Sequence, residues 1–314
     1  MPQQLPTPTY VRDLDRFTES RSTHARRSAS GTEVRLATGA YLATSEFRDL
    51  DELDRYRVAI RAVAETRRHD MVVSHWSAAA LHGLPIVGRW PTEVHVSIGK
   101  VSGGRSRREV VKHALTIEDH DVVEIDGMLV TSIARTVLDL AVYADRRTAV
   151  VAVDRALLID RLGRTSPLAT RDELWDCYFG RGNFRGAVRA RAVLEFGATG
   201  AESALESVSR LSMRTIGCPV PELQRAFRDY RGAIGNADFY WERYRLVGEA
   251  DGAVKYLDEN LRGQRSADDV VLAEKHREDR IRGVGERVTR WPWAVGIRPQ
   301  ALRRHLQQAG LPIP

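Results

Sequence analysis

The chain has 314 residues, of which 43% are hydrophobic and 29% charged, and its formal net charge is +6. This length predicts about two domains, and the composition excludes a disordered chain, a collagen-like repeat and a disulfide-rich miniprotein. The two cysteines, Cys177 and Cys218, lack the CxxC or Cys/His spacing of a zinc site. The mild basic excess is compatible with a nucleic-acid partner but does not require one.

The apolar segments are too short to cross a membrane. The most apolar stretch, residues 149–159, is interrupted by Asp154 and Arg155. A membrane span needs ~20 consecutive apolar residues, and a secretory signal needs an apolar core that the N-terminus lacks. We therefore expect a cytoplasmic protein without a membrane partner.

The first 70 residues predict a small module of a hairpin and helices. The segment VRLATGAYLA at 34–43 indicates two short strands around a glycine, and residues 51–67 carry apolar side chains at helical spacing. This combination favours a winged-helix-like module over residues 1–70. A simple N-terminal α+β extension is the alternative.

Residues 71–165 predict a second, middle α/β domain. Its expected elements alternate strands and helices, and turn signals such as Asp126–Gly127 separate them. They are a strand at 71–75, a helix closed by Gly83, a strand at 92–98, a hairpin over 121–133, and a long helical stretch over 134–158 with a break near 144–147. Residues 166–200 predict a helical linker.

The last third of the chain predicts one further domain, at residues 201–295. An amphipathic helix comes first, and three strands, a helix and a last strand follow it. The expected ranges are 201–216, 223–229, 237–241, 244–250, 267–282 and 287–291. Residues 296–314 are expected to form a C-terminal tail.

Three acidic residues in this last domain stand at the ends of predicted strands. Asp238 opens the second strand, Glu249 ends the third, and Asp251 follows two residues later. Hairpin pairing would bring Asp238 close to Glu249, and an oxygen-rich site of this kind suits Mg²⁺ or Mn²⁺. The alternative is that strand-end acids before a glycine are turn residues only.

A metal at these carboxylates would position a water molecule and stabilise charge on a phosphate. Lys255 and Lys275 are the candidate residues for additional positive charge in the transition state. Glu206, on the preceding helix, is expected to orient a water molecule at the metal.

Two stretches, NADFYWERYRLVGEADGAVKY and VVLAEKHREDRIRGVGERVTRWPW, carry these residues. Together they resemble the PD-(D/E)XK nuclease superfamily, and most of all its small domains related to very-short-patch-repair endonucleases. The resemblance implies a restriction-endonuclease-like αβββαβ fold, with Asp238 and Glu249 as the motif acids and Glu206 as the helix acid. Asp251 stands where the superfamily pattern has lysine, so Lys255 or Lys275 must replace it in an active enzyme.

The first two-thirds of the chain contain LATGAYLA, VVSHWSAAALHGLP, WPTEVHVSI and VTSIARTVLDLAV. These segments resemble antitoxins and transcriptional regulators of the AbiEi type. The resemblance implies a winged helix followed by an α/β domain, DNA binding, and a nucleotidyltransferase-type toxin as partner. The candidate phosphate contacts are basic residues in two places: Arg26, Arg27 and Arg35 near the N-terminus, and Arg105, Arg107, Arg108 and Lys112 in or beside the loop after residue 98.

Two main hypotheses follow for a multidomain α/β (α+β) protein. In the first, the chain is a DNA-associated protein whose C-terminal domain is a Mg²⁺-dependent deoxyribonuclease. In the second, it is a non-catalytic DNA-binding regulator or antitoxin of a type IV, AbiE-like toxin–antitoxin system. A third interpretation, a pair of structural domains without a nucleic-acid role, also stays open.

Overall fold

A computed structural model shows a mixed α/β protein built from two compact units. Unit 1 comprises Met1–Ala156 and Leu168–Glu195, and unit 2 comprises Leu157–Pro167 and Phe196–Pro314. The middle and linker segments expected from the sequence are thus divided between the units, because 157–167 belongs with the C-terminal part. The structure describes residues 5–14, 21–67, 71–99, 109–161, 163, 165–251 and 267–314, without the side chains of 267–271.

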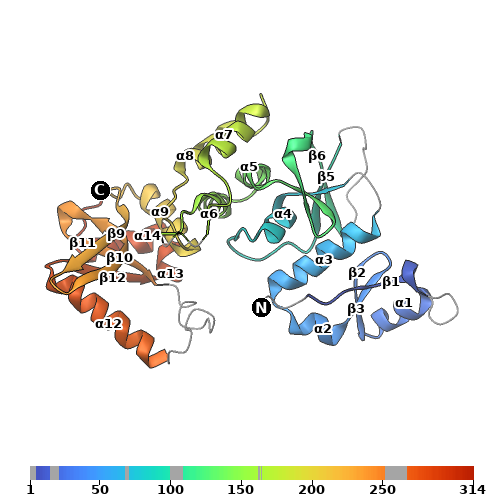
Figure 1. Ribbon diagram of the computed structural model, residues 1–314, viewed down its shortest axis with the longest axis horizontal. Coiled ribbons are helices and arrows are strands. Elements are labelled where there is room, and N and C mark those ends of the chain that lie inside the picture. Colours follow the sequence, from blue (N-terminus) through green and yellow to red (C-terminus); the bar gives the residue numbers. More distant parts are fainter. Residues whose placement is uncertain are drawn as a thin grey trace. The chain divides into compact units, whose positions relative to one another are not determined.

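Unit 1 begins with a three-stranded antiparallel sheet in the order β1-β3-β2 (Figure 1). Its hairpin turns at Gly39, whose φ of +83° lies in the left-handed region that glycine tolerates, as the sequence pattern predicted. Helix α1 lies in a polar stretch that offers no amphipathic signal. The elements are β1 Thr9–Tyr10, the 3-10 helix Val11–Asp13, α1 Arg21–Ala29, β2 Glu33–Ala37, β3 Ala40–Ala43, α2 Thr44–Asp49 and α3 Glu52–Thr66.

A second sheet of unit 1 has five strands in the order β6-β5-β4-β8-β7. The predicted turn at Asp126–Gly127 joins β7 to β8, and the predicted helix break lies between α5 and α6. The elements are β4 Val72–Val73, α4 His75–His82, β5 Val94–Ile98, β6 Val110–Ala114, the 3-10 helix Asp119–Asp121, β7 Val122–Ile125, β8 Met128–Thr131, α5 Ile133–Tyr143, α6 Arg146–Leu157, α7 Arg171–Gly180 and α8 Ala187–Phe196.

One hydrophobic core joins the two sheets of unit 1. Leu36 from β2, Val63 from α3, Val96 from β5 and Val130 from β8 are all buried in the same cluster. Helix α3 supplies an apolar face to both sheets, since its residues Tyr56, Ile60 and Val63 follow helical spacing. The described residues between 5 and 67 therefore pack as part of a larger folded unit.

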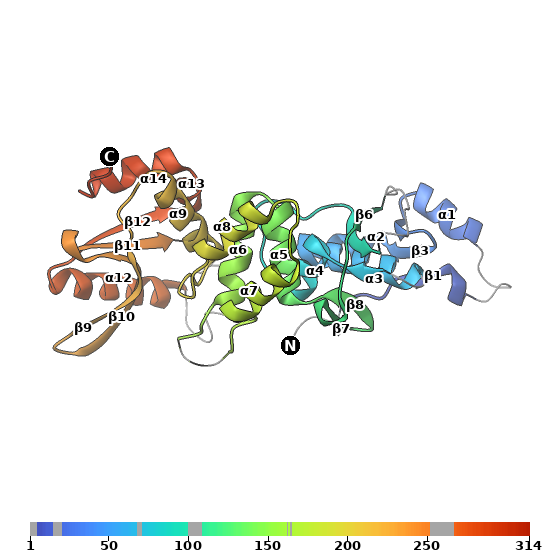
Figure 2. The same ribbon diagram turned by 90° about the horizontal axis from the view of Figure 1, so that it is seen from above.

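Unit 2 has a four-stranded sheet in the order β12-β11-β10-β9, in which β11 and β12 are parallel and the other pairs antiparallel. Figure 2 shows α12 along one face of this sheet and α9, α13 and α14 along the other. The elements are α9 Ala204–Thr215, β9 Glu222–Asp229, β10 Gly232–Trp241, the 3-10 helix Glu242–Tyr244, β11 Leu246–Asp251, α12 Ala267–Gly283, β12 Arg287–Pro292, α13 Trp293–Gly296 and α14 Pro299–Gln308.

The segment expected as a C-terminal tail is part of the packed structure. Helix α14 packs against α9, and its Leu302 and Leu306 are completely buried. Leu311 and Ile313, beyond the helix, are buried as well. None of the helices in the described ranges has the length and apolar character that crossing a lipid bilayer requires.

Candidate active site

The buried strand β11 brings Glu249 into the sheet of unit 2. A side chain at the preceding residue, Gly248, would collide with two indole rings, because a Cβ there would lie 2.7 Å from Trp291 and 2.9 Å from Trp241. Glycine thus lets the two tryptophans pack closely on one face of β11. Side chains alternate along a strand, so Glu249 points to the opposite face, with Val247.

Strand pairing brings Asp238 beside Glu249. The β10–β11 ladder runs from Trp241–Leu246 to Phe239–Gly248, and one more step places Asp238 opposite Glu249. Asp238 Oδ2 accepts a hydrogen bond of 2.8 Å from the Ala250 amide. Both carboxylates are buried, with 7% and 6% of their residues' surface exposed. The sequence-based expectation that these two acids converge agrees with this geometry.

Glu206 is linked to Asp238 through a glutamine. Gln224 of β9 donates from Nε2 to Glu206 Oε2 at 3.0 Å and to Asp238 Oδ1 at 3.4 Å. Glu206 lies in the first turn of α9, where its carboxylate also accepts from the amide of Glu202 at 3.0 Å and from the Ser203 hydroxyl at 2.7 Å. The helix start thus fixes Glu206 at the edge of the carboxylate pair.

A guanidinium from α12 contacts the other carboxylate. Arg277 Nη2 lies 2.8 Å from Glu249 Oε1 and 2.8 Å from Glu274 Oε1, and Nη1 donates to the Asn236 carbonyl. Lys275 is exposed, and two residues correspond to about 200° around a helix, so it lies on the side of α12 away from Arg277. The structure therefore places Arg277, and not Lys275, at the carboxylates.

Burial and the negative charge of Asp238 together raise the pKa of Glu249 to about 7, although Arg277 opposes the shift. Two carboxylates that are buried together repel each other unless a cation or a proton compensates. Perturbed carboxylates of this kind are common at functional sites.

These residues fit a hard divalent cation. Within the described ranges no group of three His, Cys, Asp or Glu side chains is arranged to hold a metal ion. Mg²⁺ needs fewer than three protein ligands, since proteins commonly bind it through one or two carboxylates and leave several waters in place. Asp238 and Glu249 would supply those two carboxylates, and the cation would relieve their mutual repulsion.

The remaining candidates of this site have different positions. Asp251 is half-buried at the end of β11, where it pairs in register with Pro292, and its carboxylate makes no hydrogen bond or ion pair among the described residues. Lys255 lies outside the described residues. Sequence reasoning missed Gln224 and Arg277, although the spacing of Glu274, Arg277, Glu278 and Ile281 follows one face of a helix and could have indicated the arginine.

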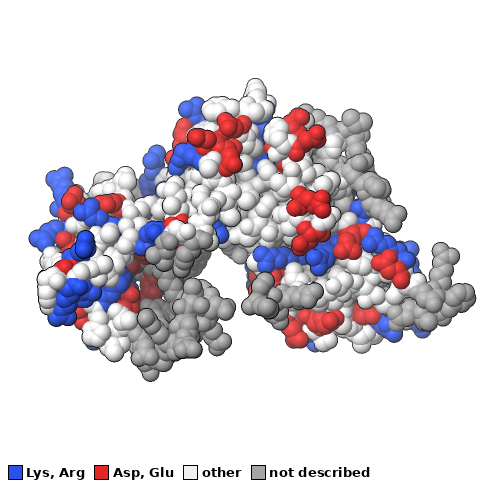
Figure 3. All heavy atoms as spheres, viewed as in Figure 1, with Lys and Arg blue, Asp and Glu red and all other residues white. Residues whose placement is uncertain are grey.

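The candidate nucleic-acid contacts are spread over unit 1. Arg26 and Arg27 are exposed in the last turn of α1, and Arg27 lies 3.4 Å from Glu33. Arg35 is exposed on β2 with Glu109 at 3.5 Å, and Lys112 is half-buried on β6. Arg105, Arg107 and Arg108 lie outside the described residues. On the face shown in Figure 3, Lys and Arg gather over unit 2, with Asp and Glu among them.

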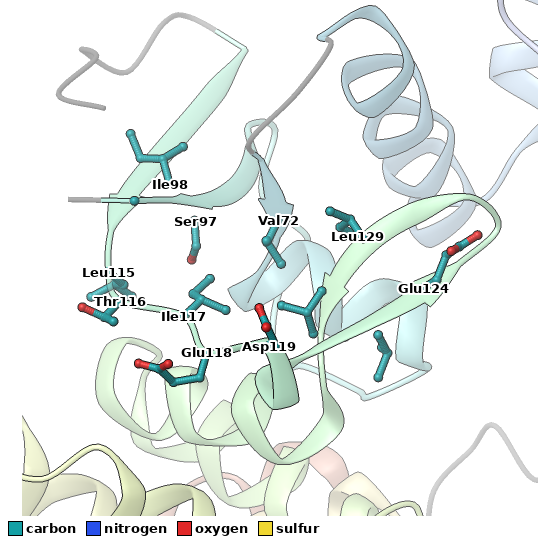
Figure 4. Close-up of a pocket in the computed structure, with 13 residues that line it drawn as sticks. Val72, Ser97, Ile98, Leu115, Thr116, Ile117, Glu118, Asp119, Glu124 and Leu129 are labelled. Carbon is teal, nitrogen blue, oxygen red and sulfur yellow. The ribbon is translucent and has the colours of Figure 1, made fainter. Parts of the chain in front are cut away.

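Unit 1 contains a cavity of about 590 Å³ (Figure 4), whereas the carboxylates Asp238 and Glu249 belong to unit 2. Strands β4, β5, β7 and β8 and the connection before β7 line it, and Glu118 and Asp119 stand on that connection. Its walls are mainly apolar, with Val72, Ile98 and Leu129 among them. The lining lacks the convergent nucleophile, base or basic cluster that would define a reaction.

Comparison with known proteins identifies relatives but assigns no activity. The chain is 32% identical over 176 residues to the uncharacterized proteins Rv2248 and MT2308 of Mycobacterium tuberculosis, strains H37Rv and CDC 1551. Each match covers 55% of this chain and 59% of the relative, so it spans somewhat more than half of either protein. No family model matches the chain.

Proposed function

We propose that unit 2 is a PD-(D/E)XK-like domain that cleaves DNA phosphodiesters with a divalent metal. The observation that supports this proposal is the buried pair Asp238 and Glu249, which lie side by side at the end of the β10–β11 ladder. The order helix, three strands, helix, strand agrees with the αβββαβ arrangement that the resemblance implies.

In this proposal each side chain has a separate role. Asp238 and Glu249 bind Mg²⁺ or Mn²⁺, which when bound stabilises negative charge on the phosphate under attack. Glu206 orients a water molecule at the edge of the pair. Arg277 supplies the positive charge that the superfamily pattern assigns to lysine, and its contact with Glu249 opposes the rise in the pKa of that carboxyl.

The test is a nicking assay on supercoiled plasmid and single-stranded DNA with Mg²⁺, Mn²⁺ or EDTA. We expect metal-dependent nicking by the wild-type protein and none by Glu249→Ala or Asp238→Asn. Glu242→Gln, which changes an exposed acid of the same unit, is the matched control and keeps full activity. Equal nicking by all four proteins would reveal a contaminant and refute the proposal, as would no nicking by any.

A specific observation favours a second candidate function, a non-catalytic DNA-binding regulator or antitoxin of the AbiE-like kind. Asp251 replaces the motif lysine, and Arg277 already neutralises Glu249 within the protein. In this alternative the winged-helix-like module at residues 1–70 binds DNA through Arg26, Arg27 and Arg35, and a nucleotidyltransferase-type toxin is the partner.

The two functions differ in whether salt-dependent DNA binding is accompanied by cleavage. Removal of one phosphate-binding side chain should reduce the slope of log affinity against log salt by roughly 0.9. We expect the double variant Arg26→Ala/Arg27→Ala to lower that slope, and Arg146→Ala, an exposed arginine of α6, to leave it unchanged. Salt-dependent binding without cleavage supports the regulator, and an unchanged slope in the double variant refutes these contacts.

A further inference from the structure

Gln224 occupies an unusual backbone conformation near the beginning of β9. Its φ is +54°, in the left-handed region that a residue with a long side chain rarely adopts. The registers on either side, Arg225–Ala237 and Leu223–Phe239, place it opposite Asp238. Strained residues of this kind persist where the surrounding structure holds them, and they cluster at functional sites.

Neighbouring residues hold this conformation in place. The Asn236 side chain donates to the Gln224 carbonyl at 2.9 Å, which ties β9 to β10 just before Asp238. The Gln224 amide nitrogen then reaches Glu206 Oε2 and Asp238 Oδ1. An ionised carboxylate only accepts hydrogen bonds, so the NH₂ group and not the amide oxygen must face the two acids.

The two oxygens of Asp238 are therefore oriented from both sides of β10. Gln224 of β9 donates to Oδ1, and the backbone amide of Ala250 in β11 donates to Oδ2. Donors behind a metal-binding carboxylate fix the direction of its remaining lone pairs and so affect metal affinity.

We propose that Gln224 is a positioning residue of the carboxylate site. Its amide joins Glu206 to Asp238 and holds Asp238 in the orientation in which it binds a divalent cation together with Glu249. This inference rests on the proposed function of unit 2. The strained backbone is retained because it directs this amide between the two acids.

Three variants of the full chain test the role. Gln224→Met keeps the size but removes the donor, Gln224→Gly removes the donor and relieves the strained φ, and Gln224→Glu places a third negative charge in the site. Gln307→Met is the matched control, because Gln307 of α14 donates its amide to the backbone carbonyl of Ile313. Mn²⁺ binding by calorimetry and the melting temperature without metal are measured for each.

We expect Gln224→Met and Gln224→Gly to weaken Mn²⁺ binding roughly 10- to 100-fold. Gln224→Gly should melt no lower than the wild type in the absence of metal, whereas Gln224→Glu should melt lower, because its carboxylate repels Glu206 and Asp238. Gln307→Met should bind Mn²⁺ as the wild type does. Loss of affinity without loss of stability is a result that a purely structural glutamine would not produce.

The outcomes separate this inference from the proposed function. If the wild type binds Mn²⁺, Glu249→Ala does not, and both donor-free Gln224 variants bind normally, the role of Gln224 is refuted while the carboxylate site stands. If affinity falls only in proportion to the melting temperature, Gln224 is structural. If the wild type itself binds no Mn²⁺, both proposals are wrong.

Discussion

At the scale of single residues, the site of unit 2 combines charges that are costly to bury separately. Glu249 is paired with Arg277, which also contacts Glu274, and Arg290 contacts Glu274 from β12 at 2.6 Å. The two arginines therefore share Glu274, and both Glu249 and Glu274 have a cation nearby. Removal of one partner from a buried pair leaves an uncompensated charge. This usually destabilises the fold more than replacement of both partners by apolar residues.

This arrangement predicts that Arg277→Met destabilises unit 2 by about 3 kcal/mol, because Glu249 then loses its cation beside Asp238. Glu249→Gln should cost less, since Arg277 retains Glu274. Urea unfolding at pH 7.5 measures both changes, and Mn²⁺ should restore part of the stability of Arg277→Met only. If Glu249→Gln proves as destabilising as Arg277→Met, the compensating role assigned to the arginine is wrong.

A second residue-scale feature is a group of three histidines in unit 1. His75 stacks on His113 with ring centroids 3.6 Å apart, and His95 Nδ1 lies 3.0 Å from His113 Nε2. Burial lowers the pKa of His95 and of His113 to about 4, and burial with the neighbouring imidazoles lowers the pKa of His75 well below its ordinary value. Asp139, Arg135 and Arg181 face the same group.

These shifts predict that acid destabilises unit 1. The unfolded chain protonates its histidines near pH 6.5, whereas the folded unit resists protonation until about pH 4. The stability is therefore fully present above pH 6.5 and is lost as the pH falls toward 4. Urea midpoints between pH 7.5 and 4 measure this, and His113→Gln should flatten the dependence relative to the wild type. An equal decline of the urea midpoint in the wild type and in His113→Gln would contradict the role assigned to the histidines.

At the scale of elements, the sequence was sufficient to predict boundaries that are set by the residues of a turn or a helix end. Gly39, Gly83 and the Asp126–Gly127 pair all have positive φ, and each ends an element where the pattern predicted a boundary. The order α9, β9, β10, β11, α12, β12 in unit 2 also agrees with the predicted order, although β11 is buried along most of its length and does not alternate.

Elements that depend on distant packing were not predictable in this way. The strand predicted at 71–75 is limited to the two residues of β4, which pair with β5 and β8. Gln224 enters the site through the register of β9 on β10, and Arg277 enters through the face of α12 that packs on the sheet. The register of β9 is not encoded in the spacing of a single segment, and the spacing within α12 indicates which residues share a face but not which carboxylate that face contacts. The proximity of Asp238 and Glu249 could be predicted, because pairing between neighbouring strands is the shortest-range contact of the site.

Helix α14 illustrates this dependence at the C-terminus. Leu302 and Leu306 are fully buried, so we expect Leu302→Ala to destabilise unit 2 by about 2–5 kcal/mol through reduced apolar packing and the cavity that remains. Arg304→Ala, at an exposed position of the same helix, is the control and should change stability little. Thermal unfolding of the two variants measures the difference, and equal effects would show that α14 is not a docked element.

At the scale of the whole molecule, the two units are interleaved along the chain. Residues 157–167 belong to unit 2, although 168–195 return to unit 1. The inserted segment is tied to unit 2 by the amide of Ile159, which donates to the Thr199 carbonyl at 3.1 Å, and by the ion pair of Arg161 with Glu202. A single cut in the chain therefore cannot separate the units cleanly.

Separate cores nevertheless predict separate unfolding transitions. Leu138 of α5 is buried in unit 1 and Leu302 in unit 2, so Leu138→Ala should lower the melting temperature of one calorimetric transition and Leu302→Ala that of the other. Mn²⁺ should raise only the transition that Leu302→Ala lowers, since a ligand stabilises the unit that binds it. If both variants shift one common transition, the units unfold cooperatively, and the stability of the carboxylate site depends on the whole chain.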